Sequence, residues 1–97
     1  MHLHLAHLPA PWLNFDVRDR GQWIGCGDLV WPEFKLYLEC DGLHHQDPRQ
    51  RHQDAQTRNR LGQLGWTVRV VTSQMIRRPY EVVAMVAEDL RANGWPG

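Results

Sequence analysis

The segment LYLECDGLHH, residues 36–45, brings acidic and imidazole side chains close together in the sequence. Glu39 and Asp41 stand two apart at the end of a strand-like alternation, and His44 and His45 follow a glycine. Side chains two apart on a strand share one face and lie about 6.6 Å apart. Carboxylates arranged in this way can hold a hard divalent cation, and imidazole can transfer a proton near neutral pH. The segment therefore indicates metal-dependent or acid–base chemistry at the end of a strand.

The strands expected to position these acids are residues 22–31 and 34–41, which Pro32 separates. Proline ends strand pairing and favours a tight connection, so the two strands should form an antiparallel hairpin. One face of this hairpin should be apolar, and the other should carry chemistry or face solvent. The register that joins apolar residues pairs Trp31 with Leu36, Val30 with Tyr37, Leu29 with Leu38, Asp28 with Glu39 and Gly27 with Cys40.

In this register three carboxylates converge, those of Asp28, Glu39 and Asp41. Like charges that face each other across strands are destabilising unless a cation neutralises them. The lysine of the chain, Lys35, is two strand pairs away. We therefore expect Mg²⁺ or Mn²⁺ at this cluster, because hard divalent cations prefer oxygen ligands.

A polar helix is expected from Pro48 to about residue 61, and it carries arginines near the acids. The planar guanidinium suits phosphate oxygens, so Arg49, Arg51 and Arg58 are predicted to contact nucleic acid. A solvated helix face is the alternative. In that case Arg49 or Arg51 would pair with the strand acids in place of a metal, and Arg58 would pair with Asp54 one helical turn earlier.

Hydrophobic periodicity predicts the remaining elements. A strand at 13–17 precedes the hairpin through the turn Asp19-Arg20-Gly21, and WTVRVV, residues 66–71, is typical of a buried central or parallel strand. A helix after Pro79 places apolar residues at helical spacing and closes at Gly94. The order β-β-β-α-β-α predicts an α/β protein of the α+β type, a mixed sheet flanked by helices. Residues 1–12 should form an irregular lead-in, and 13–94 a single domain.

Composition excludes several classes of protein. A chain of 97 residues with 42% hydrophobic residues and five tryptophans suits one small folded domain. Its formal net charge of zero does not by itself indicate a nucleic-acid partner. Without a signal peptide or an apolar run of about 18 residues, no membrane association and a cytoplasmic location are expected. Three early histidines could bind a metal or belong to a plain terminal segment; they are His2, His4 and His7.

Two longer stretches carry a family resemblance. GDLVWPEFKLYLECDGLHH and DAQTRNRLGQLGWTVRVVT resemble the endonuclease-like domains known as domain of unknown function 559. These domains are related to the very-short-patch-repair endonucleases of the PD-(D/E)XK nuclease superfamily, and the resemblance spans residues 8–94. It implies a restriction-endonuclease-like fold and a DNA endonuclease that hydrolyses phosphodiester bonds with Mg²⁺ or Mn²⁺. The alternative is a catalytically degenerate nuclease-fold module for nucleic-acid binding or regulation.

The resemblance also implies roles for single residues. Asp28 is similar to the first acid of the family motif and Glu39 to the second, which together hold the metal ion with the backbone carbonyl of Cys40. Asp41 stands where the superfamily has its lysine, and His44 is the natural substitute as the proton-transferring group.

The start of the chain departs from the family pattern. Family members begin with a helix before the first strand, whereas MHLHLAHLPAPW is short and interrupted by prolines. We therefore expect that a second copy of the chain, in a homodimer, or another partner supplies the missing N-terminal layer.

Overall fold

The computed structural model describes the backbone of residues 8–40 and 48–97, and the side chains of 8–40 and 55–97. The order of elements confirms the predicted β-β-β-α-β-α sequence, with one short helix added before the last. In chain order the elements are β1 (Trp12–Asp19), β2 (Gln22–Trp31), the 3₁₀ helix η1 (Pro32–Phe34), β3 (Leu36–Cys40), α1 (Pro48–Gln63), β4 (Thr67–Val71), α2 (Ser73–Ile76) and α3 (Pro79–Ala92).

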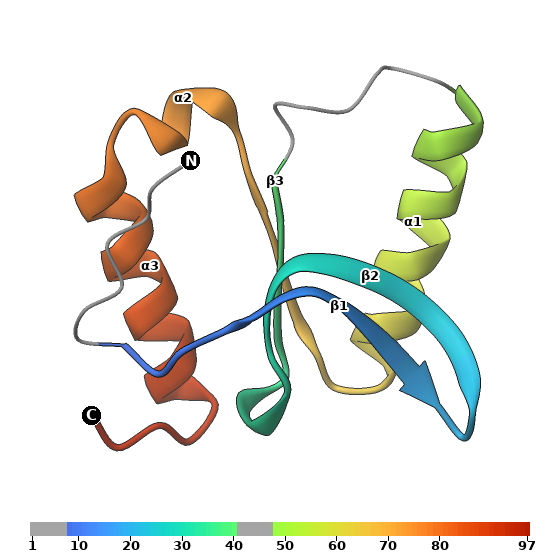
Figure 1. The fold of residues 1–97 in the computed structure, drawn as a ribbon, viewed down its shortest axis with the longest axis horizontal. Coiled ribbons are helices and arrows are strands. Elements are labelled where there is room, and N and C mark those ends of the chain that lie inside the picture. The colour runs from blue at the N-terminus through green and yellow to red at the C-terminus, as the bar shows by residue number, and fades with distance from the viewer. Residues whose placement is uncertain (1–7, 41–47) are drawn as a thin grey trace.

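The strands form a mixed sheet in the order β1-β2-β3-β4, which confirms the predicted fold class. β2 is antiparallel to both β1 and β3, and β4 is parallel to β3. A parallel pair requires a long crossover, and the connection that contains α1 provides it. Figure 1 shows α1 and α3 on opposite sides of the sheet. The predicted parallel pairing of β4 is confirmed, but β4 lies at an edge of the described sheet and not at its centre.

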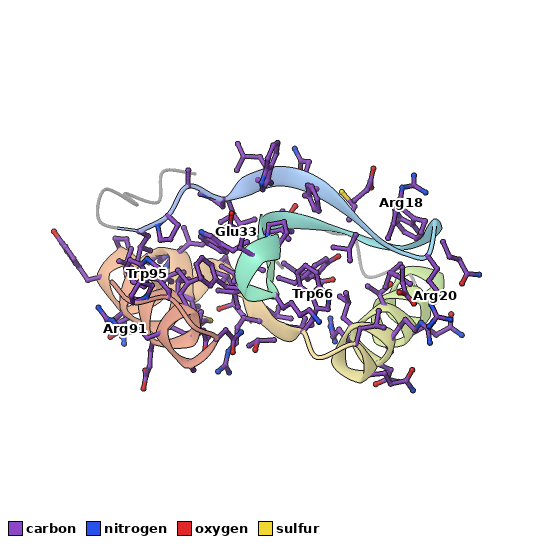
Figure 2. All side chains as sticks on the ribbon, turned by 90° about the horizontal axis from the view of Figure 1, so that it is seen from below. Arg18, Arg20, Glu33, Trp66, Arg91 and Trp95 are labelled. Atoms are coloured by element: carbon purple, nitrogen blue, oxygen red, sulfur yellow. The ribbon has the colours of Figure 1, made fainter. Side chains whose placement is uncertain are left out.

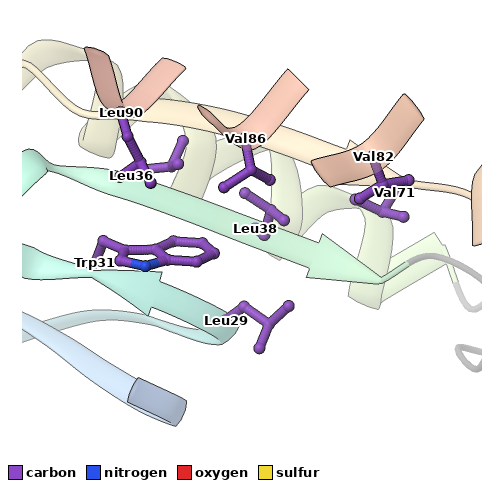
Figure 3. Packing of buried hydrophobic residues seen from close by; sticks show 8 residues of the cluster. All are labelled: Leu29, Trp31, Leu36, Leu38, Val71, Val82, Val86 and Leu90. Carbon is purple, nitrogen blue, oxygen red and sulfur yellow. The ribbon is translucent and has the colours of Figure 1, made fainter. Parts of the chain in front are cut away.

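One core lies between the sheet and α3. The helix contributes Val82, Val86 and Leu90, which are at most 1% exposed. This period follows the predicted apolar stripe, and the strands face it with leucine and valine (Figure 3). Trp31 completes the core at 2% exposure, and its indole N–H donates a hydrogen bond to the Pro9 carbonyl at 2.8 Å. This bond ties part of the predicted lead-in to the sheet.

A second core fills the opposite face, beneath α1. Its buried members include Val30, Tyr37 and Leu61, and Tyr37 is only 1% exposed. Trp66 packs against this core and Trp95 against the α3 core, as Figure 2 shows from below. The prediction that one face of the hairpin carries chemistry or faces solvent was therefore wrong over most of its length. A helix covers each face, so both faces of β3 are apolar up to Leu38.

Two glycines let α1 approach the hairpin closely. A Cβ atom at Gly25 would lie 2.5 Å from Thr57 Cγ2, and one at Gly27 would lie 2.5 Å from Val30 Cγ2 and 2.9 Å from the ring of Tyr37. Such distances are too short for any side chain larger than hydrogen. The small residues of β2 therefore set how closely the helix and Tyr37 pack against the strand.

The predicted turn at Asp19-Arg20-Gly21 is confirmed. Asp19 pairs with Gln22, which leaves a two-residue hairpin loop. Both loop residues have positive φ, 52° at Arg20 and 82° at Gly21, as in a type I′ turn. The hairpin is longer than predicted, because β1 extends from Trp12 to Asp19. No helix in the described part of the chain is long and apolar enough to cross a membrane.

Candidate metal and nucleic-acid site

Asp28 meets β3 through its side chain. Its Oδ2 accepts a hydrogen bond of 2.7 Å from the backbone N–H of Cys40. The predicted register is confirmed for the three pairs Trp31–Leu36, Val30–Tyr37 and Leu29–Leu38, where the observed ladder ends. The predicted continuation through Asp28–Glu39 and Gly27–Cys40 was wrong, since a side-chain carboxylate replaces the next ladder interaction.

The physical reason is a break in the strand alternation at Asp28. In a regular strand Gly27 and Leu29 would point to the same face. Leu29 belongs to the core beneath α3, whereas a Cβ atom on Gly27 would meet Tyr37 in the core beneath α1. Asp28 therefore lies where the strand changes its orientation, and its carboxylate turns toward the end of β3.

Glu39 is paired with an arginine of α1. Its Oε2 lies 3.5 Å from Arg58 Nε, with side-chain exposures of 16% for Glu39 and 45% for Arg58. This contact resembles the alternative in which helix arginines neutralise the strand acids, although that alternative named Arg49 or Arg51. The guanidinium of Arg58 therefore supplies positive charge at a cluster for which a metal ion was expected.

Cys40 contributes its backbone and not its thiol. The side chain is 3% exposed, and burial together with the negative charge of Asp28 raises the pKa of the thiol above its ordinary value. A thiol that stays protonated is a poor zinc ligand, because the thiolate is the form that binds metal. The donors at this end of β3 are thus oxygens: two carboxylates and the carbonyl of Cys40.

Several predicted site residues lie outside the described residues or have side chains that are not described. Within the described side chains, no group of three or more histidine, cysteine, aspartate and glutamate residues could hold a metal ion. The third carboxylate and the imidazole of the prediction are not among those side chains. Asp41, His44 and the early His2, His4 and His7 lie outside the described residues, and Arg49 and Arg51 belong to the part of α1 without described side chains.

Sequence analysis missed a groove beside this cluster, between the end of the β1–β2 hairpin and α1. No local pattern could have revealed it, because its two walls are more than thirty residues apart in the chain. Only the positive charge of Arg60 was visible in the sequence. The groove is lined by Gln22, Trp23, Ile24, Gln56, Thr57 and Arg60.

Comparison with known proteins finds distant relatives. Uncharacterized protein Rv2248 of Mycobacterium tuberculosis strain H37Rv and uncharacterized protein MT2308 of strain CDC 1551 are each 29% identical to the chain over 85 residues. The match covers 86% of this chain and 31% of each relative, so the chain spans about a third of their length. No protein-family model and no solved structure matches the chain.

Proposed function

We propose that this chain is a metal-dependent endonuclease domain that hydrolyses phosphodiester bonds in DNA. The observation that carries the proposal is the hydrogen bond from the Cys40 N–H to Asp28. It brings the Asp28 carboxylate, which β2 supplies, to the end of β3 where Glu39 and the Cys40 carbonyl stand. Three oxygen donors from two strands thus gather at one end of the sheet.

This set of donors fits Mg²⁺ or Mn²⁺. Both ions prefer oxygen ligands, and Mg²⁺ is commonly bound by one or two carboxylates together with water. The resemblance in the sequence supports the same assignment, with Asp28, Glu39 and the Cys40 carbonyl as the metal-binding groups. When bound, the ion would activate a water molecule and polarise the scissile phosphate.

The chain's own residues would position the substrate and move the proton. Asp41 is proposed to orient the attacking water, and His44 to accept or donate the proton near neutral pH. Arg49, Arg51 and Arg58 would contact phosphates, which gives affinity without sequence information. The partner of the site is DNA, and a second copy of the chain or another protein is proposed to complete the N-terminal layer.

A second candidate is a catalytically degenerate module that binds nucleic acid or regulates a nuclease. The ion pair between Glu39 and Arg58 favours it, because Arg58 already provides part of the positive charge that a metal ion would supply. The two candidates differ in whether removing either acid changes anything beyond stability.

Nicking of supercoiled plasmid DNA with and without Mg²⁺ tests the proposal. Asp28→Asn and Glu39→Gln should each abolish cleavage, since either change removes a charged ligand. Glu33→Gln is the matched control, because Glu33 is an exposed acid on η1 away from the cluster. Circular dichroism should show that all three variants are folded. Mg²⁺-dependent cleavage that survives in both Asp28→Asn and Glu39→Gln would refute the metal site, and a wild-type chain that binds DNA without cleaving it would support the second candidate.

A further inference from the structure

The groove between the hairpin and α1 has the dimensions of a ligand site. It has a volume of about 330 Å³, within the range of about 300–1,000 Å³ found for small-ligand pockets. Thr57 Oγ1 donates a hydrogen bond of 3.1 Å to the Ile24 carbonyl and so fastens the helix to the strand at the floor of the groove. The walls are therefore held in place by a direct contact between α1 and β2.

An aromatic ring stands in the groove with its orientation set. Trp23 is 54% exposed, and its indole N–H donates a hydrogen bond of 3.0 Å to Asp16 Oδ1. A large exposed aromatic side chain with its polar edge already bonded offers its ring faces to a ligand. The amides of Gln22 and Gln56 also line the groove, and each can both donate and accept hydrogen bonds.

Arginines surround this ring. Arg60 lies in the groove, where its Nη2 is 3.2 Å from Asp19 Oδ2, and it remains 46% exposed. Arg18 and Arg20 are exposed at the end of the hairpin that reaches over α1 (Figure 2). Asp19 and Asp16 are the acids here, and both already accept hydrogen bonds, so the available charge is positive.

Arg20 occupies a backbone position that opposes its residue type. Its φ is 52° in a type I′ turn, where asparagine, aspartate and glycine are strongly preferred. Strained positions of this kind tend to accompany function. An arginine at the tip of the hairpin, beside an aromatic groove, suits contact with an extended anion.

We propose that this groove binds a single-stranded segment of nucleic acid, with one base stacked on Trp23 and its phosphates near Arg60 and Arg20. Stacking needs a base with a free face, and in a duplex both faces are covered by neighbouring base pairs. Gln22 and Gln56 are placed to meet the edge of the base. The inference rests on the proposed function and deepens it, because α1 carries both Arg58, which reaches Glu39, and the groove wall.

Fluorescence polarisation with labelled oligonucleotides of equal length tests the groove in EDTA, where cleavage cannot occur. The probes are single-stranded DNA, single-stranded RNA and duplex DNA. The wild-type chain should bind single strands more tightly than duplex, and Trp23→Ala should weaken single-strand binding by about 5- to 150-fold, the range that corresponds to stacking on one base. Trp23→Phe should retain most of the affinity, since it keeps an aromatic face.

Trp12→Ala is the matched control, because Trp12 is 63% exposed on the same hairpin but outside the groove. It should leave the affinity unchanged. Arg60→Gln should reduce the slope of log affinity against log salt by about 0.7, as expected for one phosphate contact to a single strand. Tighter binding of either RNA or DNA would support the proposal and show which sugar the groove accepts.

A preference for duplex DNA, no binding to single strands, or equal losses in Trp23→Ala and Trp12→Ala would overturn the proposal. These outcomes concern binding in the absence of metal. Failure of the nuclease proposal would instead appear as metal-dependent cleavage that persists in Asp28→Asn and Glu39→Gln, or as no cleavage with binding intact.

Discussion

Replacement of Asp28 by alanine should destabilise the fold more than replacement by asparagine. The Asp28 carboxylate accepts the Cys40 N–H at 2.7 Å in a partly buried position where the ladder between β2 and β3 has ended. Hydrogen bonds to charged groups contribute about 1.5–3 kcal/mol to stability, and neutral ones about 0.5–1.5 kcal/mol. Alanine removes the acceptor, whereas asparagine keeps a carbonyl oxygen in its place. We therefore expect losses of about 1.5–3 kcal/mol for Asp28→Ala and about 1 kcal/mol for Asp28→Asn.

Thermal unfolding followed by circular dichroism without divalent ions measures the difference. In a domain of this size each kcal/mol shifts Tm by about 4–8 °C, so Asp28→Ala should lower Tm by about 6–24 °C and Asp28→Asn by about 4–8 °C. Asp16→Ala is the control, since Asp16 accepts the indole N–H of Trp23 in an exposed position and its loss should cost little. Equal Tm values for wild type and Asp28→Ala would show that the carboxylate does not support the end of β3.

This hydrogen bond changes an expectation that the sequence alone suggested. If Asp28 and Glu39 faced each other directly, removing one charge would relieve repulsion and stabilise the metal-free fold. With the observed contacts, both acids have partners, the Cys40 N–H and Arg58, so neutralising Asp28 should cost stability. Loss of cleavage in Asp28→Asn can be ascribed to the missing charge only if the fold survives, which makes the stability measurement part of the functional test.

Three further predictions concern packing, strain and pH. Gly27→Ala should cost about 1–3 kcal/mol because its Cβ would lie 2.5 Å from Val30, whereas Gly62→Ala, a helical position with nothing within 4 Å, should gain about 1 kcal/mol; urea unfolding that shows the same sign for both would contradict this view. Arg20→Asn should raise the unfolding free energy by about 1 kcal/mol as the positive φ is relieved, and a lower value would show that the arginine is not strained. Burial raises the pKa of the Cys40 thiol, so the folded state holds its proton longer and the stability that depends on it is lost as pH rises above the ordinary value of 9.0. The fall should be smaller in Cys40→Ala, and identical pH profiles of the two proteins between pH 8 and about 11 would exclude the effect.

Apolar pairing explains why much of the sheet could be predicted from the sequence. Sliding β3 by one residue would turn Leu36 and Leu38 away from their core, so the register with Trp31 and Leu29 is strongly determined. The last helix was equally accessible, since the apolar residues of α3 recur with the period that faces one core. In both cases the signal lies within a single element or between neighbours in the chain.

The site could be predicted only in part, because its contacts depend on how separate elements pack. Nothing in the local sequence shows that Gly25 and Thr57 meet, yet this approach sets the position of α1 and therefore which arginine reaches Glu39. The side chain four residues earlier, at Asp54, was a reasonable partner for Arg58 by helical spacing alone. Arg69 presents the same problem in β4, where two hydrogen bonds of 2.9 Å to Asp89 of α3 join residues twenty apart.

The ion pair between Glu39 and Arg58 bears on the choice between an endonuclease and a degenerate module. Nearly half of the Arg58 side chain is exposed, and the Nε–Oε2 distance of 3.5 Å is long for a charge-assisted hydrogen bond. Pairs of this kind contribute about 0–1 kcal/mol, because solvent screens them and the long side chain loses freedom. A contact this weak neutralises Glu39 without holding it, so a divalent cation that also binds Asp28 and a backbone carbonyl could displace Arg58 at little cost. The displaced guanidinium would then lie beside the metal-binding acids, where a phosphate of the substrate must come.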